Sequence, residues 1–366
     1  HFEEDCKKCM RHCVPLEFRT GDNLMPPIPL IRNVFLAPSI AFLADEGISV
    51  DRYLRRARLS APTPETMQSL IPLRQLCDLL SLVAHEQDLN DLGFRIAGQL
   101  GIESLGTYGR IITRAFTLHE SILLSRELIS AFNSGQQIWL EHHGDQVRYC
   151  QKLVGSLPPS RTKEVQHLGL AIALAVVGVG RGNDWRPTQI ELAANPIDLG
   201  DYVPELADIP ISFNQSHTSV WFDRTWLSKP LPRVESFHCP SAYEAERASF
   251  LETGPCQEPI DQLEQAIESA FGHPELGLQM TAAIIGMSPR TLQRHLAEEG
   301  QSFSRLLQSV RFRTAQQLLR DPAMPLTEIS RRLSYADLAN FIRAFKCWTG
   351  LGPNEFRKLH YENQHD

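Results

Sequence analysis

Residues 280–300 read MTAAIIGMSPRTLQRHLAEEG, and residues 326–350 read LTEISRRLSYADLANFIRAFKCWTG. Each stretch contains two large apolar residues four positions apart with an arginine between them: Leu292, Arg294 and Leu296, then Phe341, Arg343 and Phe345. Residues four apart lie on one face of an α-helix, so each pair predicts a helix with one buried face. A short apolar segment and a turn precede both helices. The repeat therefore predicts two helix-turn-helix motifs, at 278–299 and 325–348.

The residues at the turns favour helix ends at the same places. Ser288 is a good N-cap, and Pro289 then occupies the first helical position, where a missing N–H costs nothing. Gly300 is typical of the residue that follows a helix, and Thr327 is expected to cap the second motif. An amphipathic helix over residues 304–320 is expected to join the two motifs.

The charge of the chain is divided unevenly. The 366 residues carry 36 Lys and Arg against 43 Asp and Glu, a formal net charge of −7, which by itself argues against a nucleic-acid ligand. Residues 280–360, however, contain 12 Lys and Arg against 6 Asp and Glu, a net of +6, which leaves −13 for the rest. A basic unit attached to an acidic body is typical of a DNA-binding domain joined to another part of the chain with a different role.

The C-terminal part, over about residues 260–358, resembles the AraC/XylS family of bacterial transcription regulators. The resemblance rests on the order and spacing of an Ile-x-x-x-Leu pattern, FIRAFK at 341–346, WTG at 348–350, a proline and a final FR. One position departs from the family pattern, because Ser334 precedes Tyr335 where the family usually has glycine before an aromatic residue. Glycine adopts the left-handed backbone conformation most easily, so we expect the turn to be less favourable with serine at this position.

The N-terminal part resembles a subset of the same family that has a larger domain of helices and strands. The stretches that carry this resemblance are DLGFRIAGQL (91–100), DWRPTQIELA (184–193) and DIPISFNQSHTSVWFDRTWLSKPLP (208–232). A β-hairpin is expected around the turn at 143–145. The predicted fold is therefore an α+β N-terminal effector-binding or dimerisation domain and an all-α C-terminal domain with two helix-turn-helix motifs joined by a helix.

Composition shifts suggest where these parts begin and end. We expect a flexible N-terminal arm over 1–33, an α+β regulatory domain over 34–230, a proline-rich linker over 231–259 with a short helix near 241–251, and the DNA-binding domain over 260–360. Within the regulatory domain, the segment 70–84 has the apolar spacing of an amphipathic helix.

The outward faces of the two second helices are expected to contact DNA. A recognition helix places its N-terminal side chains against base edges in the major groove, while helix N-termini and basic residues bind phosphates. The expected DNA-binding residues are Ser288, Arg290, Thr291, Gln293, Arg294, Thr327, Arg331, Asp337, Asn340, Arg343 and Lys346, with His295 at the edge of the face. Arg294 and Arg343 occupy the same position in both repeats. For any single residue, the alternative is a solvated side chain without a role.

Together with the resemblance, these residues predict a sequence-specific regulator that binds double-stranded promoter DNA. The family implies activation of RNA polymerase in response to a small-molecule effector, in a chain that can form a homodimer, with repression as the alternative. A further alternative is a thiol- or metal-responsive binding protein that uses the basic domain only as an interaction module. Because no catalytic motif such as HExxH or GxSxG occurs, we expect no enzymatic activity and no cofactor.

Two other groups of residues offer chemistry. Near the N-terminus, metal-ligating or redox-active side chains are present at Cys6, Cys9, His12 and Cys13. A mobile arm is the favoured interpretation, because structural zinc sites usually place the second ligand pair further away. In the strand-rich segment, Phe213, Trp221, Phe222 and Trp226 either line an effector pocket or, as is more common for such aromatics, belong to the core.

The composition also predicts where the protein acts. The longest apolar run, at 168–180, is shorter than the roughly 20 residues that span a membrane, and the first residues lack the apolar segment of a secretory signal. Eight cysteines without a regular framework fit a reducing compartment. We therefore expect a cytoplasmic protein with no membrane partner.

Overall fold

The chain is described from a computed structural model, which covers residues 25–89, 91–98, 101–155, 157–179, 185–194, 206, 208–231 and 240–362. The N-terminal cluster of Cys6, Cys9, His12 and Cys13 lies outside the described residues. Within them, no helix is both long and apolar enough to cross a membrane.

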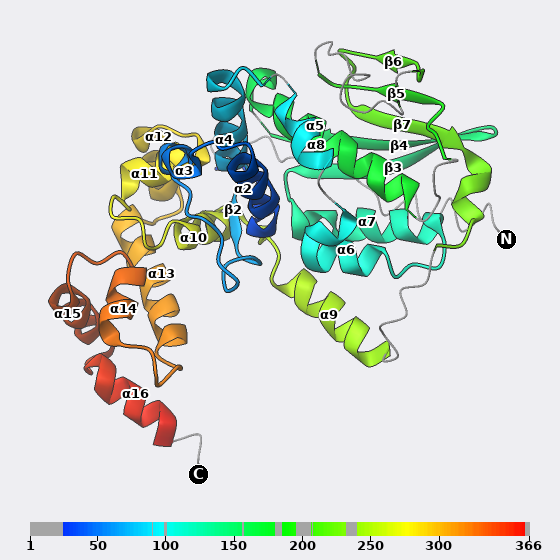
Figure 1. The fold of residues 1–366 in the computed structure, drawn as a ribbon. Coiled ribbons are helices and arrows are strands. Elements are labelled where there is room, and N and C mark those ends of the chain that lie inside the picture. Colours follow the sequence, from blue (N-terminus) through cyan, green and yellow to red (C-terminus); the bar gives the residue numbers. More distant parts are fainter. Residues whose placement is uncertain are drawn as a thin grey trace.

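The N-terminal part combines helices with a mixed β-sheet (Figure 1). Its helices are α2 (Leu36–Asp45), α3 (Val50–Ala57), α4 (Leu73–Glu86), α5 (Leu92–Gly98), α6 (Gly106–Ile112), α7 (Leu118–Phe132) and α8 (Pro159–Gly178). Short 3₁₀ turns lie at Asn33–Phe35, Ile102–Leu105 and Arg224–Ser228. The expected mixture of helices and strands is confirmed.

The described strands of the main sheet run in the order β3 (Gln136–His143), β4 (Gln146–Leu153), β7 (Thr218–Asp223), β5 (Gln189–Glu191) and β6 (Ile211–Ser212). Pairing is antiparallel except between β5 and β6. The expected hairpin is β3–β4, which turns at Gly144 with a φ of 63°. Alternate residues such as Val147, Tyr149, Val220 and Phe222 are buried in the core, so the next residues along each strand form the opposite face.

The expected helix over 70–84 begins later than predicted. Leu70–Pro72 forms strand β2, and helix α4 starts only at Leu73. Pro72 explains the difference, because a proline disfavours helical backbone at the residue before it. Periodicity alone did not reveal this boundary.

The expectation of a flexible arm over 1–33 is wrong for residues 25–33. Strand β1 (Leu30–Arg32) pairs with β2, and both Met25 and Ile28 are buried. Arg32 is only 1% exposed, and its guanidinium donates to the carbonyl oxygens of Ala131, Gln68 and Phe250 at 2.9, 3.0 and 2.7 Å. These bonds satisfy a buried charge and fix the segment to the regulatory domain.

The segment 231–259, expected as a linker, contains a packed helix. Helix α9 (Pro240–Glu252) lies beside α6 and α7, and Phe250 near its end is 3% exposed. The Arg32 guanidinium lies 4.2 Å from the centre of the Phe250 ring. The short helix expected near 241–251 is therefore present as α9, and it packs on the regulatory domain instead of standing free in a linker.

The C-terminal part is helical among the described residues. It comprises α10 (Pro259–Ser269), α11 (Leu278–Ile285), α12 (Pro289–Glu298), α13 (Phe303–Leu318), α14 (Leu326–Arg332), α15 (Leu338–Thr349) and α16 (Pro353–Glu362). One apolar cluster joins α10–α13, and a second joins the end of α13 to α14–α16. Two lobes therefore share the long helix α13, as the sequence predicted.

The first of these lobes packs against the regulatory domain. Met25, Ile28, Leu30 and Leu70 belong to the same apolar cluster as Leu292 and Leu296 of α12. The Ile28 amide also donates a buried hydrogen bond of 2.7 Å to the Gln262 side chain in α10. The second lobe lies further from the sheet (Figure 1).

Candidate nucleic-acid interface

Helices α11 and α12 form the first helix-turn-helix. Gly286 ends α11 with a φ of 82°, a conformation that suits glycine. Ser288 is the N-cap of α12 and accepts a 3.0 Å hydrogen bond from the Thr291 amide, with Pro289 at the first helical position. Leu292 and Leu296 are fully buried. The cap and the buried pair together aim the opposite face of α12 at solvent.

That outward face carries most of the expected side chains. Arg290, Gln293 and Arg294 are exposed, whereas Thr291 is half-buried and shares a 2.7 Å hydrogen bond with the Ser288 hydroxyl. His295 does not belong to this face, because it is 6% exposed and its Nδ1 lies 3.3 Å from a Glu298 oxygen. The helical turn simply carries residue 295 back towards the core beside Leu292.

Helices α14 and α15 form the second motif. Asp337 is the N-cap of α15: its carboxylate accepts hydrogen bonds from the Asn340 amide at 2.7 Å and from the Asn340 side chain at 2.8 Å. The Asn340 oxygen in turn accepts a 2.5 Å hydrogen bond from Arg343. Phe341 and Phe345 are fully buried. Asp337 and Asn340 thus orient the exposed guanidinium of Arg343, a local network that residue spacing alone did not reveal.

The expectation that Thr327 caps the second motif is wrong. The N-cap of α14 is Pro325, which makes no side-chain capping bond, and Thr327 lies inside the helix. Arg331, one of the expected phosphate ligands, donates twice to Glu328, at 2.8 and 2.7 Å, and Arg332 donates to the same carboxylate. These bonds lower the pKa of Glu328 to about 2. In the free protein both guanidinium charges are therefore balanced in part.

The turn after α14 contains the departure from the family pattern. Ser334 has a φ of 57°, so a non-glycine residue does adopt the left-handed backbone there. Arg311 of α13 donates to the carbonyl oxygens of Leu333 and Ser334 at 3.0 and 2.9 Å and lies 4.4 Å from the centre of the Tyr335 ring. The Ser334 hydroxyl accepts a 2.9 Å hydrogen bond from the Gly272 amide. These contacts hold the turn and connect it to α13.

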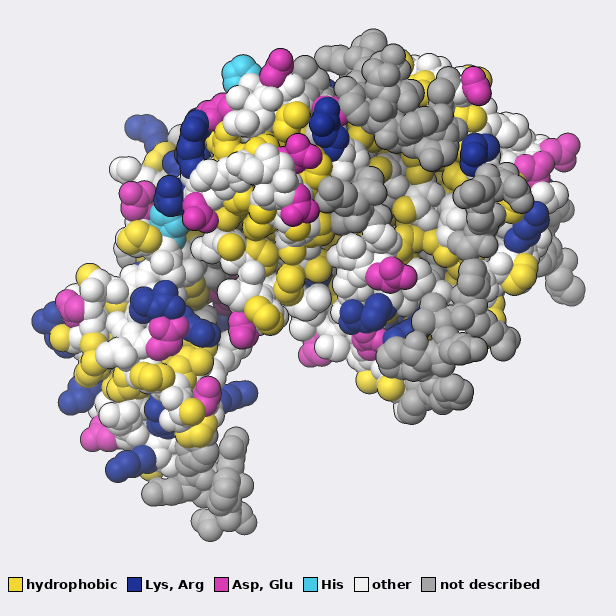
Figure 2. Space-filling view, viewed as in Figure 1, with side chains coloured by type: hydrophobic (Ala, Val, Ile, Leu, Met, Phe, Trp, Pro, Cys, Tyr) yellow, Lys and Arg dark blue, Asp and Glu magenta, His cyan; other side chains and the backbone are white. Residues whose placement is uncertain are grey.

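Positive side chains are distributed over the whole C-terminal unit. Figure 2 shows Lys and Arg side chains spread over the lobe at the lower left, which corresponds to α13–α16 in Figure 1. Lys346 is exposed in the last turn of α15. Such a surface attracts the phosphate backbone of DNA whatever the sequence.

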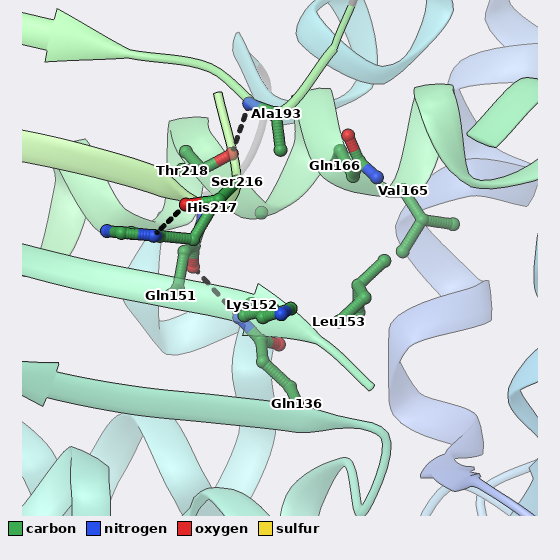
Figure 3. A pocket seen from close by; sticks show the side chains of 11 residues that line it. Gln136, Gln151, Lys152, Leu153, Val165, Gln166, Ala193, Ser216, His217 and Thr218 are labelled. Carbon is green, nitrogen blue, oxygen red and sulfur yellow. Dashed lines mark hydrogen bonds between the residues drawn. The ribbon is translucent and has the colours of Figure 1, made fainter. Parts of the chain in front are cut away.

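The regulatory domain contains a small polar cavity of about 90 Å³ between α8 and the sheet (Figure 3). Its lining includes Gln136, Gln151, Lys152, Gln166 and Thr218. The aromatic residues named in the sequence lie elsewhere: Phe222 is fully buried in the core, and Phe213 and Trp226 pack against it. For Phe222 the core interpretation is therefore confirmed.

Two family models match the chain. A model described as the arabinose-binding domain of AraC transcription regulators matches residues 47–231, and a model described as a helix-turn-helix domain matches residues 281–359. The first covers the described sheet together with the helices around it. The second covers both helix-turn-helix motifs. The two parts that the sequence predicted thus correspond to two recognised domains.

Several curated regulators are similar to the chain. VirS of Mycobacterium tuberculosis, an HTH-type transcriptional regulator, is 34% identical over 360 residues, which are 90% of each chain. An uncharacterized regulator of the same organism is 32% identical over 150 residues, which are only 43% of that regulator's length. The ornithine utilization regulator of Pseudomonas aeruginosa is 40% identical over 81 residues, which are 24% of that regulator's length.

A search of solved structures finds the transcriptional regulator CdpR of Pseudomonas aeruginosa. It is 19% identical, with a TM-score of 0.42, over 89% of this chain and 98% of that one. The family assignment rests on the two domain models and on the full-length similarity to VirS. The chain belongs to the AraC family and is a DNA-binding transcription regulator.

Proposed function

We propose that the protein is an effector-responsive activator that reads two adjacent major-groove segments with α12 and α15. The observation that carries this proposal is the shared helix α13, which connects two N-capped recognition helices through two apolar clusters. A rigid connection of this kind favours reading on one face of the duplex, and bending of the site would let both helices dock.

Within this arrangement the expected residues are assigned different roles. Arg294 and Arg343 are proposed to contact bases, since each is exposed on the recognition helix and an arginine can bind guanine through two hydrogen bonds. Arg290, Gln293, Asn340 and Lys346 are proposed as further contacts. Ser288 and Arg331 are proposed to bind phosphates. Asp337, in contrast, is proposed to act through Asn340 and Arg343.

The partners of the regulatory domain are also proposals. We propose that a small-molecule effector binds this domain, that RNA polymerase is the target of activation and that the chain can form a homodimer. The cavity of about 90 Å³ is smaller than the roughly 300 Å³ of ordinary ligand sites, so a sugar-sized effector would have to widen it. We propose no enzymatic role, in keeping with the family, and an action in the cytoplasm, where promoter DNA lies.

The test is binding of the full chain to its own upstream region, measured by gel shift over a salt series. Arg294→Ala and Arg343→Ala should each weaken specific binding by about 5- to 150-fold, the loss expected for one bidentate base contact. The control is Arg313→Ala on α13, which removes one equal charge from a residue paired with Glu264 and Glu268. If both variants bind like wild type across the series, the proposed docking is wrong.

A further inference from the structure

The polar face of the main sheet carries a group of metal-ligating side chains outside the DNA-binding part. Glu141 lies on β3, Cys150 on β4 and His217 directly before β7. One potential ligand atom from each of these residues lies within 4.8 Å of the other two. Two of the residues lie on the adjacent strands β3 and β4 and the third lies just before the next strand, β7, and no pattern in the sequence indicates that they meet.

The strand register explains why they meet. Cys150 is paired with Trp139 on β3 and with Ser219 on β7. Glu141 is two residues from Trp139 on β3, and His217 is two residues from Ser219 on β7. Both residues are therefore diagonal neighbours of Cys150, one on each side of it. Diagonal neighbours on one face of a sheet are within reach of long side chains.

His217 presents a free ligand atom to this group. Its Nδ1 shares a 2.9 Å hydrogen bond with the Ser216 hydroxyl, and its Nε2 is buried with no hydrogen-bond partner among the described residues. A histidine that ligates a metal usually has its other nitrogen fixed in this way by a neighbouring polar group. In Figure 3 the His217 ring extends along the sheet, away from Val165 and Gln166 of α8, with the bond to Ser216 drawn.

The surroundings hold the carboxylate in place. Trp139 donates to one Glu141 oxygen at 2.8 Å, and its ring centre lies 4.9 Å from that of His217. Arg148 donates to the other Glu141 oxygen at 3.2 Å and also pairs with Glu191. A carboxylate oxygen retains further lone pairs after accepting these bonds, so it can still bind a cation.

We propose that Glu141, Cys150 and His217 bind a thiophilic divalent metal ion such as Zn²⁺. Thiolate, imidazole and carboxylate are the protein ligands of zinc, and a set of three leaves a fourth position for water or a small molecule. The bond lengths of such a site place ligand atoms about 3.5 Å apart, so modest side-chain rotations close the site.

The formal charges fit this occupant. The carboxylates of Glu141 and Glu191 and the guanidinium of Arg148 have a combined charge of −1. Zn²⁺ bound to the Cys150 thiolate adds a charge of +1. The bound cluster would be neutral, which suits a partly buried position.

The test measures metal binding directly and does not depend on DNA. The full chain carries Cys6→Ser, Cys9→Ser and Cys13→Ser, so that the N-terminal thiols do not contribute. Titration with Co²⁺ should give one thiolate-to-cobalt charge-transfer band per chain, and competition with a chromophoric chelator should give one Zn²⁺ site. Cys150→Ser should abolish the band, and Cys347→Ser, which removes an exposed thiol, should leave it unchanged.

His217→Gln keeps a polar side chain of similar size and guards against misfolding of the Cys150 variant. It should weaken Zn²⁺ binding by more than the 10- to 100-fold that loss of an outer-shell partner typically causes, with an unchanged circular dichroism spectrum. The proposal is overturned if the background protein binds neither ion, or if Cys150→Ser and His217→Gln bind Zn²⁺ as the background protein does.

Discussion

Arg311 of the connecting helix α13 donates two hydrogen bonds to the turn between α14 and α15. We predict that Arg311→Met loosens the second lobe while leaving the first intact. Hydrogen bonds from a charged donor contribute about 1.5–3 kcal/mol each, and the methionine retains part of the contact with Tyr335. Two such bonds are lost, to the carbonyls of Leu333 and Ser334, a gross loss of about 3–6 kcal/mol. Both bonds are only part-buried, so water replaces them in part, and we expect a net loss of about 2–4 kcal/mol in the local free energy of opening.

Hydrogen exchange of the full chain measures this opening. Amides of residues 326–349 should exchange about 30- to 700-fold faster, because every 1.4 kcal/mol corresponds to a factor of ten. Amides of α11 and α12 should exchange as in wild type. On DNA, the variant should lose affinity for the complete site but retain the weak binding that the first lobe provides.

Arg313→Met on the same helix is the matched control. Its guanidinium pairs with Glu264 and Glu268 at 2.8 and 3.0 Å, and the side chain is 48% exposed. Exposed pairs of this kind contribute at most about 1 kcal/mol. Exchange within about 3-fold of wild type in Arg311→Met, or an equal effect in Arg313→Met, would refute the reasoning.

Three further predictions concern single residues. Asp337→Ala removes the cap of α15 and should destabilise the second lobe by about 1 kcal/mol with weaker DNA binding, whereas Asp337→Asn should behave nearly as wild type in thermal melts. Arg32→Met leaves buried carbonyls without a donor and should lower the free energy of unfolding of the regulatory domain, measured in urea, by about 3–5 kcal/mol. As the control, Arg52→Met at an exposed ion pair should lower it by no more than about 1 kcal/mol. Glu328→Gln frees two guanidinium groups and should strengthen DNA binding. The bonds to both arginines lower the pKa of Glu328 to about 2, so the stability that the Glu328 carboxylate contributes is fully present above the ordinary pKa of a glutamate and is lost as the pH falls through about 2. The stability of the wild-type protein should therefore fall more steeply with acid than that of the variant.

Each of these predictions has a distinct contrary result. Equal melting of Asp337→Ala and wild type would show that the cap carries no stability. If Arg32→Met unfolds in urea like the wild type, the carbonyl partners of Arg32 must accept hydrogen bonds from water instead. Weaker DNA binding of Glu328→Gln would indicate that Glu328 orients the two arginines for DNA and does not compete with it.

The local pattern of the C-terminal part was readable from the sequence for a physical reason. Helix caps and buried pairs four residues apart depend on neighbours in the chain, so Ser288, Leu292 and Leu296 predict their own helix without tertiary information. The same reasoning failed at Thr327, because the N-cap of α14 is Pro325, two residues earlier, and the helix begins at Leu326. This helix begins without any side-chain capping bond.

Contacts between distant segments could not be predicted. The bonds of Arg311 to the Ser334 turn and of Arg32 to Phe250 join residues 23 and 218 positions apart, and no periodicity encodes them. The group of Glu141, Cys150 and His217 depends on the register of β4 against β7, which a sequence does not specify when long segments separate the strands. His295 was predicted at the edge of the exposed face of α12, but it is buried. Residues at the edge of a helix face lie only a small rotation away from the buried face, so spacing alone does not decide between the two.

The claim that two recognition helices read adjacent major-groove segments is tested most directly by a footprint. Hydroxyl-radical cleavage and guanine-methylation interference would be measured with the full chain on its own upstream DNA. The proposed docking predicts two protected major-groove segments on one face of the duplex, about one helical turn (10–10.5 base pairs) apart, with interference at one segment lost in Arg294→Ala and at the other in Arg343→Ala. A single protected segment, or interference patterns that both variants share with wild type, would contradict it.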